Sequence, residues 1–155
     1  MIKSPDLQRF DSRSCMYALR YGRSHIHGVG VFALECIPRG KKVIEYTGER
    51  LTTAQATRRY RRILSDGNRP NCLLRLNHRW ILDGARHGSG AERINHSCDP
   101  NLRPKNTNGH MWFLSKRRIH IGEELTLDYR YGADLPSVRC RCGTCNCRGT
   151  INLKR

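Results

Sequence analysis

Short apolar runs bounded by glycine, proline or asparagine recur along the chain. Residues 31–33 follow a glycine turn at residues 28–30, and residues 42–48 follow the turn signal at residues 38–40. Runs of this length between turn residues favour β-strands. Further strands are predicted at residues 73–76, 80–83, 111–114 and 124–127. Many short strands with one helix predict a mainly β fold.

A helical period replaces this pattern after residue 51. Apolar positions recur at helical spacing, at Ala56, Tyr60, Ile63 and Leu64. Thr52 or Thr53 can provide the N-cap, and Asp66-Gly67 ends the pattern. The opposite face carries arginines without nearby acids, at Arg58, Arg59, Arg61 and Arg62. Because like charges this close repel one another, the pattern leaves open a solvated face or one that contacts an anion.

The charge of the chain is strongly unbalanced. Its 155 residues include 29 Lys and Arg but only 13 Asp and Glu, a formal net charge of +16. This excess indicates a polyanionic partner or an acidic surface, with a simple solubility charge as the alternative. The arginine-rich helix and Lys116-Arg117-Arg118 are therefore candidates for nucleic-acid contact.

The length predicts one domain with short appendages, and the first dozen residues are expected to form a loose leader. The sequence has no secretory hydrophobic region and no apolar stretch that could span a bilayer, so no membrane partner is expected. We expect an intracellular protein, at chromatin in a eukaryote or in the cytoplasm or nucleoid of a bacterium. The oligomeric state is left open.

The segment Ile94-Asn95-His96-Ser97-Cys98-Asp99-Pro100-Asn101 is the densest in polar chemistry. It combines an amide, an imidazole and a thiol, which indicates a ligand site. The residue before a proline is pushed out of the helical region. The side chains of Asn95, His96 and Cys98 are therefore predicted to lie on a bend.

Four of the eight cysteines crowd into one short segment, at Cys140, Cys142, Cys145 and Cys147. In a reducing compartment such clustering indicates metal binding, and zinc prefers four sulfur or nitrogen ligands in a tetrahedron. Three of these thiols have suitable spacing, Cys140, Cys142 and Cys147. The fourth ligand is either the local Cys145 or Cys98 from the polar segment.

Two other segments are weak signals alone. The sequence Gly28-Val29-Gly30 usually marks a turn, and residues 122–131 form a turn, a strand and two tyrosines around a basic residue. Taken together with residues 45–49, 94–101 and 140–147, in this order, they resemble a SET-domain protein-lysine methyltransferase with a post-SET zinc tail. The resemblance runs from roughly residue 20 to residue 153.

This resemblance implies the SET-domain β-clip fold, with several short sheets, one main helix and a pseudoknot-like threading of the C-terminal part. It divides the chain into an N-terminal leader (1–19), a SET domain (20–134) and a post-SET tail (135–155). In such a tail one structural zinc ion is held by four thiolates, here Cys98, Cys140, Cys142 and Cys147. Cys145 is then the spare thiol.

The resemblance also implies S-adenosylmethionine as the methyl donor. The residues that match the cofactor site are His27, Gly28, Val29, Gly30, Asn95 and His96. Tyr129 matches the catalytic tyrosine, which also borders the cofactor, and Tyr46 matches an aromatic of the lysine channel, with Tyr131 as a further candidate. Lysine has an ordinary pKa near 10.4, so transfer requires a site that favours the neutral amine. Positioning is then expected to supply much of the rate.

The expected substrate is a lysine of a histone tail or of another basic chromatin protein. The chain departs from the family at Glu92-Arg93, where many relatives have Arg-Phe, and at Leu127, where Phe or Tyr is common. A leucine there predicts products beyond monomethyl-lysine. The alternative function is a catalytically weak SET-like module that binds nucleic acid or a protein peptide.

Overall fold

The computed structural model describes residues 10–154 except 12, 63–71 and 134. Its elements are short, and most are strands. In chain order they are β1 (Leu19–Arg23), β2 (Val29–Ala33), β3 (Lys42–Tyr46), β4 (Glu49–Leu51), α1 (Thr53–Arg59), β5 (Leu73–Arg75), β6 (Ile81–Asp83), the 3-10 helix η1 (Ala91–Arg93), β7 (Asn95–His96), β8 (Leu102–Thr107), β9 (His110–Ser115) and β10 (Thr126–Leu127).

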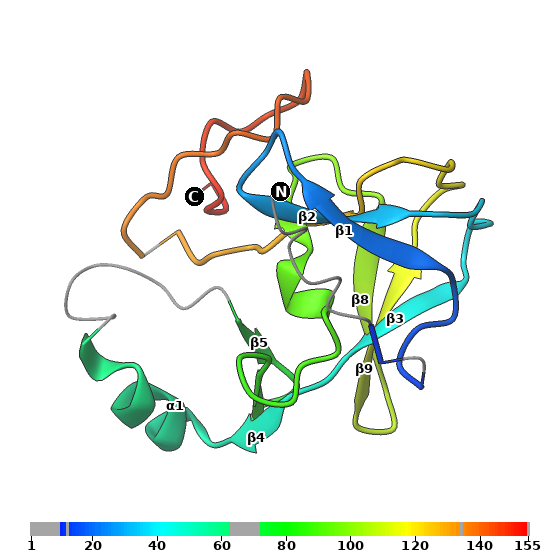
Figure 1. Ribbon diagram of the computed structural model, residues 1–155. Coiled ribbons are helices and arrows are strands. Elements are labelled where there is room, and N and C mark those ends of the chain that lie inside the picture. Colours follow the sequence, from blue (N-terminus) through cyan, green and yellow to red (C-terminus); the bar gives the residue numbers. More distant parts are fainter. Residues whose placement is uncertain (1–9, 12, 63–71, 134, 155) are drawn as a thin grey trace, which may run out of the picture.

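These strands form small sheets instead of one large one. β3, β9 and β8 form an antiparallel sheet in that order, and β4, β6 and β5 form another. β1 pairs antiparallel with β2, whereas β7 pairs parallel with β10. Figure 1 shows α1, β4 and β5 on one side of the molecule, β3, β8 and β9 on the other, and the C-terminal segment above them. The mainly β prediction is confirmed.

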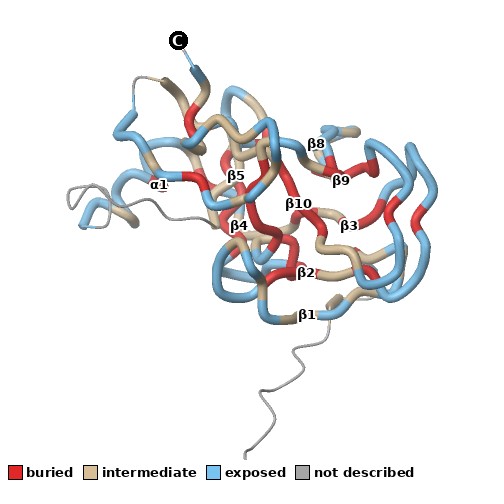
Figure 2. Tube along the Cα trace, turned by 90° about the horizontal axis from the view of Figure 1, so that it is seen from above, coloured by how far each residue is buried: buried red, intermediate tan, exposed pale blue. Residues whose placement is uncertain are grey.

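The core lies where these small sheets meet. Buried positions gather along β2, β3, β9 and β10, and exposed residues cover the loops around them (Figure 2). Phe113 on β9 is 1% exposed, while Ile44 on β3 and Leu125 before β10 are fully buried. Fully burying such side chains contributes about 1.5–3 kcal/mol each. This packing fixes the segments that lead into the polar region around residues 94–101.

The strands predicted from apolar runs are confirmed in β2, β3, β5, β6, β9 and β10. β1, β4 and β8 were not predicted. β8 contains Pro104 and polar side chains, and it forms because a two-residue turn joins it to β9. Asn108 and Gly109 in that turn have φ values of 52° and 82°, the left-handed region that a tight hairpin turn requires.

The predicted bend at Asn95 and His96 is wrong. These two residues form β7, in which they pair parallel with Thr126 and Leu127, and the Ser97 N–H continues the ladder by donating to the Leu127 carbonyl over 3.0 Å. The bend starts beyond them, because the pairing leaves no room for an earlier turn.

Asn101 also joins the chain segment that follows β7 to the segment that leads into β10. Its side chain is 1% exposed and donates to the Glu123 carboxylate over 2.9 Å and to the Glu124 carbonyl over 2.8 Å. The Thr126 N–H donates back to Asn101 Oδ1 over 2.8 Å. This clamp explains how a strand as short as β10 keeps its place. The knot-like threading of the C-terminal part stays a prediction.

α1 begins as predicted, with Thr52 as its N-cap. The Thr52 hydroxyl accepts from the Gln55 N–H, and the Gln55 side chain accepts from the Thr52 N–H over 2.8 Å, which completes a capping box. The expected apolar positions Ile63 and Leu64 and the stop at Asp66-Gly67 lie outside the described residues.

The expectation that acids are lacking near the arginines of α1 is wrong for Arg59. Its guanidinium contacts Glu49 over 2.8 Å and the fully buried carboxylate of Asp83 over 2.7 Å. Arg59 and Asp83 are 24 residues apart in the sequence, so their pairing could not be predicted from neighbouring residues.

The described part of the predicted leader contacts the sheets. The Phe10 ring stacks on Tyr21 with centroids 4.3 Å apart, and Cys15 forms an isolated bridge with Ile44. Among the described residues, no helix has the length and apolarity needed to cross a membrane.

Candidate active site and cysteine cluster

A cavity of about 400 Å³ opens between the β4–β6–β5 sheet and the segment that follows β10. Three tyrosines line it, together with Leu127, Phe113 and the carboxylate-bearing Glu92; the tyrosines are Tyr46, Tyr129 and Tyr131. A largely apolar cavity with aromatic walls, which we call the channel, suits an extended aliphatic side chain that ends in an amine.

Tyr129 is fixed at both its backbone and its hydroxyl. Its N–H donates to His96 Nδ1 over 3.1 Å, and its Oη donates to the Ile94 carbonyl over 2.8 Å. Burial, followed by the nearby Tyr131 and Glu124, raises the pKa of the phenol above its ordinary value. The hydroxyl is therefore protonated at neutral pH and acts as a hydrogen-bond donor, not as a base.

Tyr46 forms another wall of the cavity. It is 5% exposed, its hydroxyl donates to the Cys72 carbonyl, and its ring lies 5.8 Å from that of Phe113. Burial, with the negative charge of Glu92 adding to it, raises the pKa of Tyr46 above its ordinary value. A neutral ring thus faces the channel, where its π-face favours an alkylammonium group.

The residues that match the cofactor site are also brought together. Asn95 Nδ2 lies 3.1 Å from the His27 carbonyl oxygen, 3.2 Å from that of Val29 and 2.9 Å from Glu124 Oε1. The Ser24 hydroxyl donates to the same Glu124 carboxylate over 2.8 Å. Asn95 is buried, whereas His27 and Val29 are exposed, so the assembled cradle has one side open to solvent.

Glycine is favoured at positions 28 and 30 of this cradle for two different physical reasons. Gly28 has φ +48°, which favours a residue without a Cβ. At Gly30 a Cβ would lie 2.2 Å from Glu124 Oε1 and 3.2 Å from Asn95 Nδ2. Glycine at position 30 is therefore needed for the protein's own packing. The sequence analysis did not predict this role of Glu124, although Glu124 lies in the segment of residues 122–131.

Of the two candidates for the fourth thiol of the cysteine cluster, Cys98 lies with the other three. The Sγ atoms of Cys98, Cys140, Cys142 and Cys147 all lie within 4.8 Å of one another. Cys98 Sγ is 3.7 Å from Cys140 Sγ and 4.0 Å from Cys147 Sγ. Zinc–sulfur bonds of about 2.3 Å give a tetrahedron with edges of about 3.8 Å, so the spacing fits.

Backbone amides around the cluster suit thiolate ligands. The Arg148 N–H donates to Cys98 Sγ, the Cys142 N–H to Cys140 Sγ and the Gly149 N–H to Cys147 Sγ, each over 3.4 Å. Such charge-assisted bonds stabilise sulfur in its anionic form. Cys145 is exposed and is not in the group.

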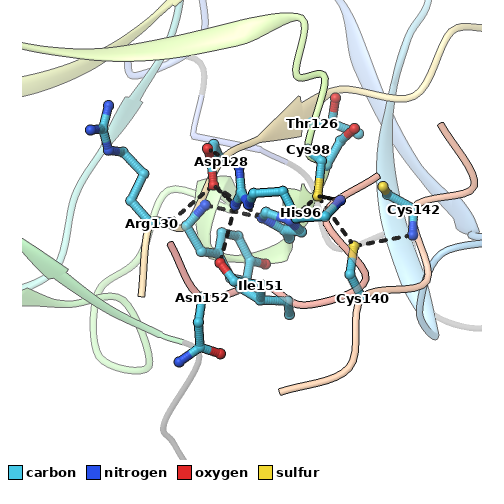
Figure 3. Close-up of polar contacts among 12 residues, drawn as sticks. His96, Cys98, Thr126, Asp128, Arg130, Cys140, Cys142, Ile151 and Asn152 are labelled. Carbon is cyan, nitrogen blue, oxygen red and sulfur yellow. Dashed lines mark hydrogen bonds and ion pairs between the residues drawn. The ribbon is translucent and has the colours of Figure 1, made fainter. Parts of the chain in front are cut away.

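His96 lies between the cluster and the segment that carries Asp128, with Cys98 and Cys140 beside it (Figure 3). His96 is 3% exposed, with Nε2 3.5 Å from Cys98 Sγ. Burial outweighs the attraction of Asp128 and lowers the pKa of His96, so its ring is neutral at pH 7. Arg148 forms two hydrogen bonds with Asp128, over 2.9 and 2.8 Å. Nothing in the linear sequence marked Arg148 as part of the site.

The unusual pair Glu92-Arg93 separates in space. Glu92 lines the cavity, and its carboxylate accepts from the Gly90 N–H over 3.0 Å. Arg93 is exposed. The linear order placed this departure from the family beside the cofactor residues. In the structure, Glu92 lies in the wall of the channel.

Comparison with known proteins identifies relatives with this arrangement of motifs. The SET domain family matches residues 28–130. Human histone-lysine N-methyltransferases SETD1B and SETD1A are 36% and 37% identical to the chain over 138 residues, which is 86% of it. The histone-lysine N-methyltransferase, H3 lysine-4 specific, of Schizosaccharomyces pombe is 34% identical over 153 residues, 95% of the chain.

These matches cover only 7%, 8% and 16% of the relatives' own lengths, respectively. The similarity therefore concerns one domain of much larger proteins. Within the chain, the family match at residues 28–130 includes Gly28, Gly30, Asn95, His96 and the cavity residues Tyr46 and Tyr129. The chain therefore belongs to the SET-domain family.

Proposed function

We propose that the chain is a protein-lysine N-methyltransferase that uses S-adenosylmethionine and acts on a histone or another basic chromatin protein. The observation that carries the proposal is the position of Tyr129. Its backbone joins the buried His96 beside the cofactor cradle, and its ring lines the aromatic channel. A residue that borders both sites can align a donor with an acceptor.

Within this proposal, S-adenosylmethionine supplies the methyl group as a sulfonium electrophile. The cradle of residues 27–30 with Asn95 and His96 would hold it, and the channel would hold the target lysine. After losing its proton to solvent, the lysine would take the methyl group through its Nζ lone pair, and the electrons of the broken carbon–sulfur bond would stay on the donor's sulfur. The products are a methylated lysine and S-adenosylhomocysteine.

The protein residues supply alignment in this reaction. Tyr46 and Tyr131 flank the aliphatic stem, and the Tyr129 hydroxyl, held by the Ile94 carbonyl, sets the position of the reacting groups. Correct alignment alone can supply about 7–11 kcal/mol of rate acceleration. Tyr129 is protonated, so no step requires it to remove a proton.

We further propose that one structural zinc ion binds the cluster of Cys98, Cys140, Cys142 and Cys147. Its position supports a role beside the channel, because the Leu153 N–H of the same tail donates to the Tyr131 carbonyl over 2.8 Å. The zinc would connect this tail to the segment that carries His96.

The enzyme proposal is tested by incubating the protein with labelled S-adenosylmethionine and purified histones, for wild type and for Tyr129→Phe. We expect label on histone lysine with wild type and a fall of about 100-fold with the variant, at unchanged cofactor affinity. Tyr17→Phe is a matched control, since Tyr17 does not line the cavity. Absence of both transfer and cofactor binding by the wild type would refute the proposal.

A second proposal concerns α1, because a concave surface there is lined by Arg58, Arg59, Arg61 and Arg62. Arg59 is engaged by Glu49 and Asp83, which leaves the exposed Arg58 and Arg61 well placed for nucleic-acid phosphates. Binding of duplex DNA should weaken steeply with salt, and Arg58→Gln with Arg61→Gln should lower the salt slope by about 2. An unchanged slope would exclude this surface. Contact with chromatin is consistent with both proposals.

A further inference from the structure

We propose that the His96 side chain is a positioning residue that couples the cysteine cluster to Tyr129. It does so through both ring nitrogens, one turned to a metal-ligating sulfur and the other to the backbone of the tyrosine. This inference rests on the proposed lysine methyltransferase function and on the proposed zinc ion. It assigns the imidazole a task separate from cofactor binding, which then falls to the His96 backbone.

The tautomer of His96 follows from its partners. A backbone N–H can only donate, so the bond from Tyr129 N–H to Nδ1 requires a lone pair on Nδ1. Because Nδ1 accepts this bond, the ring proton lies on Nε2. That nitrogen is 3.5 Å from Cys98 Sγ, within the distance for an N–H donor to sulfur. The ring thus accepts from the active-site backbone and donates to the cluster.

Other groups around the ring do not compete for this arrangement. Asp128 Oδ1 lies 3.6 Å from His96 Nδ1, but both Asp128 oxygens accept from Arg148 over 2.8 and 2.9 Å. Its charge is therefore held by a guanidinium. The His96 ring also meets the Tyr129 ring edge-on, with centroids 5.4 Å apart and planes at 63°. Packing and hydrogen bonding fix the same orientation.

A displacement of Cys98 Sγ would reach Tyr129 through one rigid ring. The imidazole is 3% exposed, and it contacts Cys98 Sγ through one ring nitrogen and Tyr129 N–H through the other. A shift of about 1 Å in a reacting group can cost about 100-fold in rate. Partners that orient metal ligands typically change metal affinity by about 10- to 100-fold when removed. His96 should therefore influence both quantities, each through a different nitrogen.

Two substitutions separate these nitrogens. In His96→Asn the amide oxygen can take the place of Nδ1 and accept from Tyr129, but no donor reaches Cys98. In His96→Gln the amide nitrogen can take the place of Nε2 and donate to Cys98, but Tyr129 N–H loses its acceptor. For both variants, zinc affinity is to be measured by competition with a chromogenic chelator. The kcat on histones is to be measured with zinc saturating.

We expect His96→Asn to bind zinc about 10- to 100-fold more weakly and, with zinc saturating, to lose a smaller factor in kcat than His96→Gln does. We expect His96→Gln to keep its zinc affinity and to lose at least about 10-fold in kcat. Equal losses of both quantities in both variants, or no loss in either, would overturn the proposal, because a merely structural histidine shows no such division.

One further measurement uses the unaltered protein and so does not depend on the folding of a variant. Long-range ¹H–¹⁵N spectra of the zinc-loaded chain should show His96 with its proton on Nε2. A proton on Nδ1 would overturn the proposal. If the wild type methylates no histone while the tautomer and the zinc affinities behave as expected, the enzyme proposal fails and the link from His96 to the cluster stands.

Discussion

Replacing Asn101 with alanine removes the hydrogen bonds that join two chain segments near the site. The 1% exposed side chain joins the loop after β7 to the start of β10 through the Glu123 carboxylate, the Glu124 carbonyl and the Thr126 N–H. In the variant the Glu124 carbonyl and the Thr126 N–H lose this partner, and the Glu123 carboxylate keeps Arg117 and the His120 N–H. We expect a large loss of stability and a displaced β10.

The magnitude follows from the kinds of bond lost. Two neutral hydrogen bonds contribute about 1 kcal/mol each, and the one to a carboxylate about 2 kcal/mol. The expected loss in free energy of unfolding is therefore about 4 kcal/mol. For a chain of this size, at about 2–4 °C for each kcal/mol, this lowers Tm by about 8–16 °C.

Urea unfolding with zinc in excess measures the loss, with Asn146→Ala as the control because Asn146 is exposed. The control should change stability by less than about 0.5 kcal/mol. If Asn101→Ala costs no more than the control, the attribution of stability to this clamp is wrong.

The variant Asn101→Asp adds a test of sign. A carboxylate at this position would accept from Thr126 N–H, but it would face the Glu123 carboxylate and the Glu124 carbonyl, so its pKa would be raised. The folded state then holds a proton that the unfolded state releases, and the variant should regain stability as pH falls.

In the wild type, burial raises the pKa of Glu123, but Arg117, the His120 N–H and Asn101 together hold it below its ordinary value. That contribution is present above about pH 4.3 and is lost as pH falls further. Parallel pH profiles would contradict this reasoning.

Three other outcomes are expected. Cys98→Ala should lower the zinc content per chain, whereas Cys145→Ala should leave it unchanged; loss in both, measured by atomic emission, would contradict the assigned cluster. Gly84→Ala places a Cβ 2.7 Å from Tyr46 Oη, so kcat/KM should fall at least about 10-fold with little loss of fold; unchanged kinetics would refute the contact. Leu127 lines the channel without a hydroxyl, so mass spectrometry should find di- or trimethyl-lysine on a good substrate, and only monomethyl product would argue against it.

The sequence predicted those elements whose pattern is local. β3 and β9 follow from apolar runs that pack on the core, and the start of α1 was predicted with Thr52 or Thr53 as its N-cap, of which the structure has Thr52. The choice of Cys98 over Cys145 could not come from spacing alone. It came from the order of motifs shared with a family, and the positions of the sulfur atoms agree with it.

Some missed features depend on partners distant in the sequence. β7 has only two residues, and its pairing with β10 is supported by Asn101 and not by apolar periodicity. β8 could have been found, because Asn108-Gly109 is a strong hairpin signal directly before β9. The partner of Arg59 could not, since Asp83 becomes its neighbour only after α1 packs against β6.

The C-terminal position of the sulfur cluster has a consequence for the synthesis of the protein. Three of the four thiols, and the Arg148 that engages Asp128, leave the ribosome after every named strand of the described chain. A prematurely stopped chain can therefore contain all of these strands and still lack the tail that holds His96 and Asp128 in place. The proposed methyl transfer would then require translation through at least Arg148, together with zinc for the proposed site.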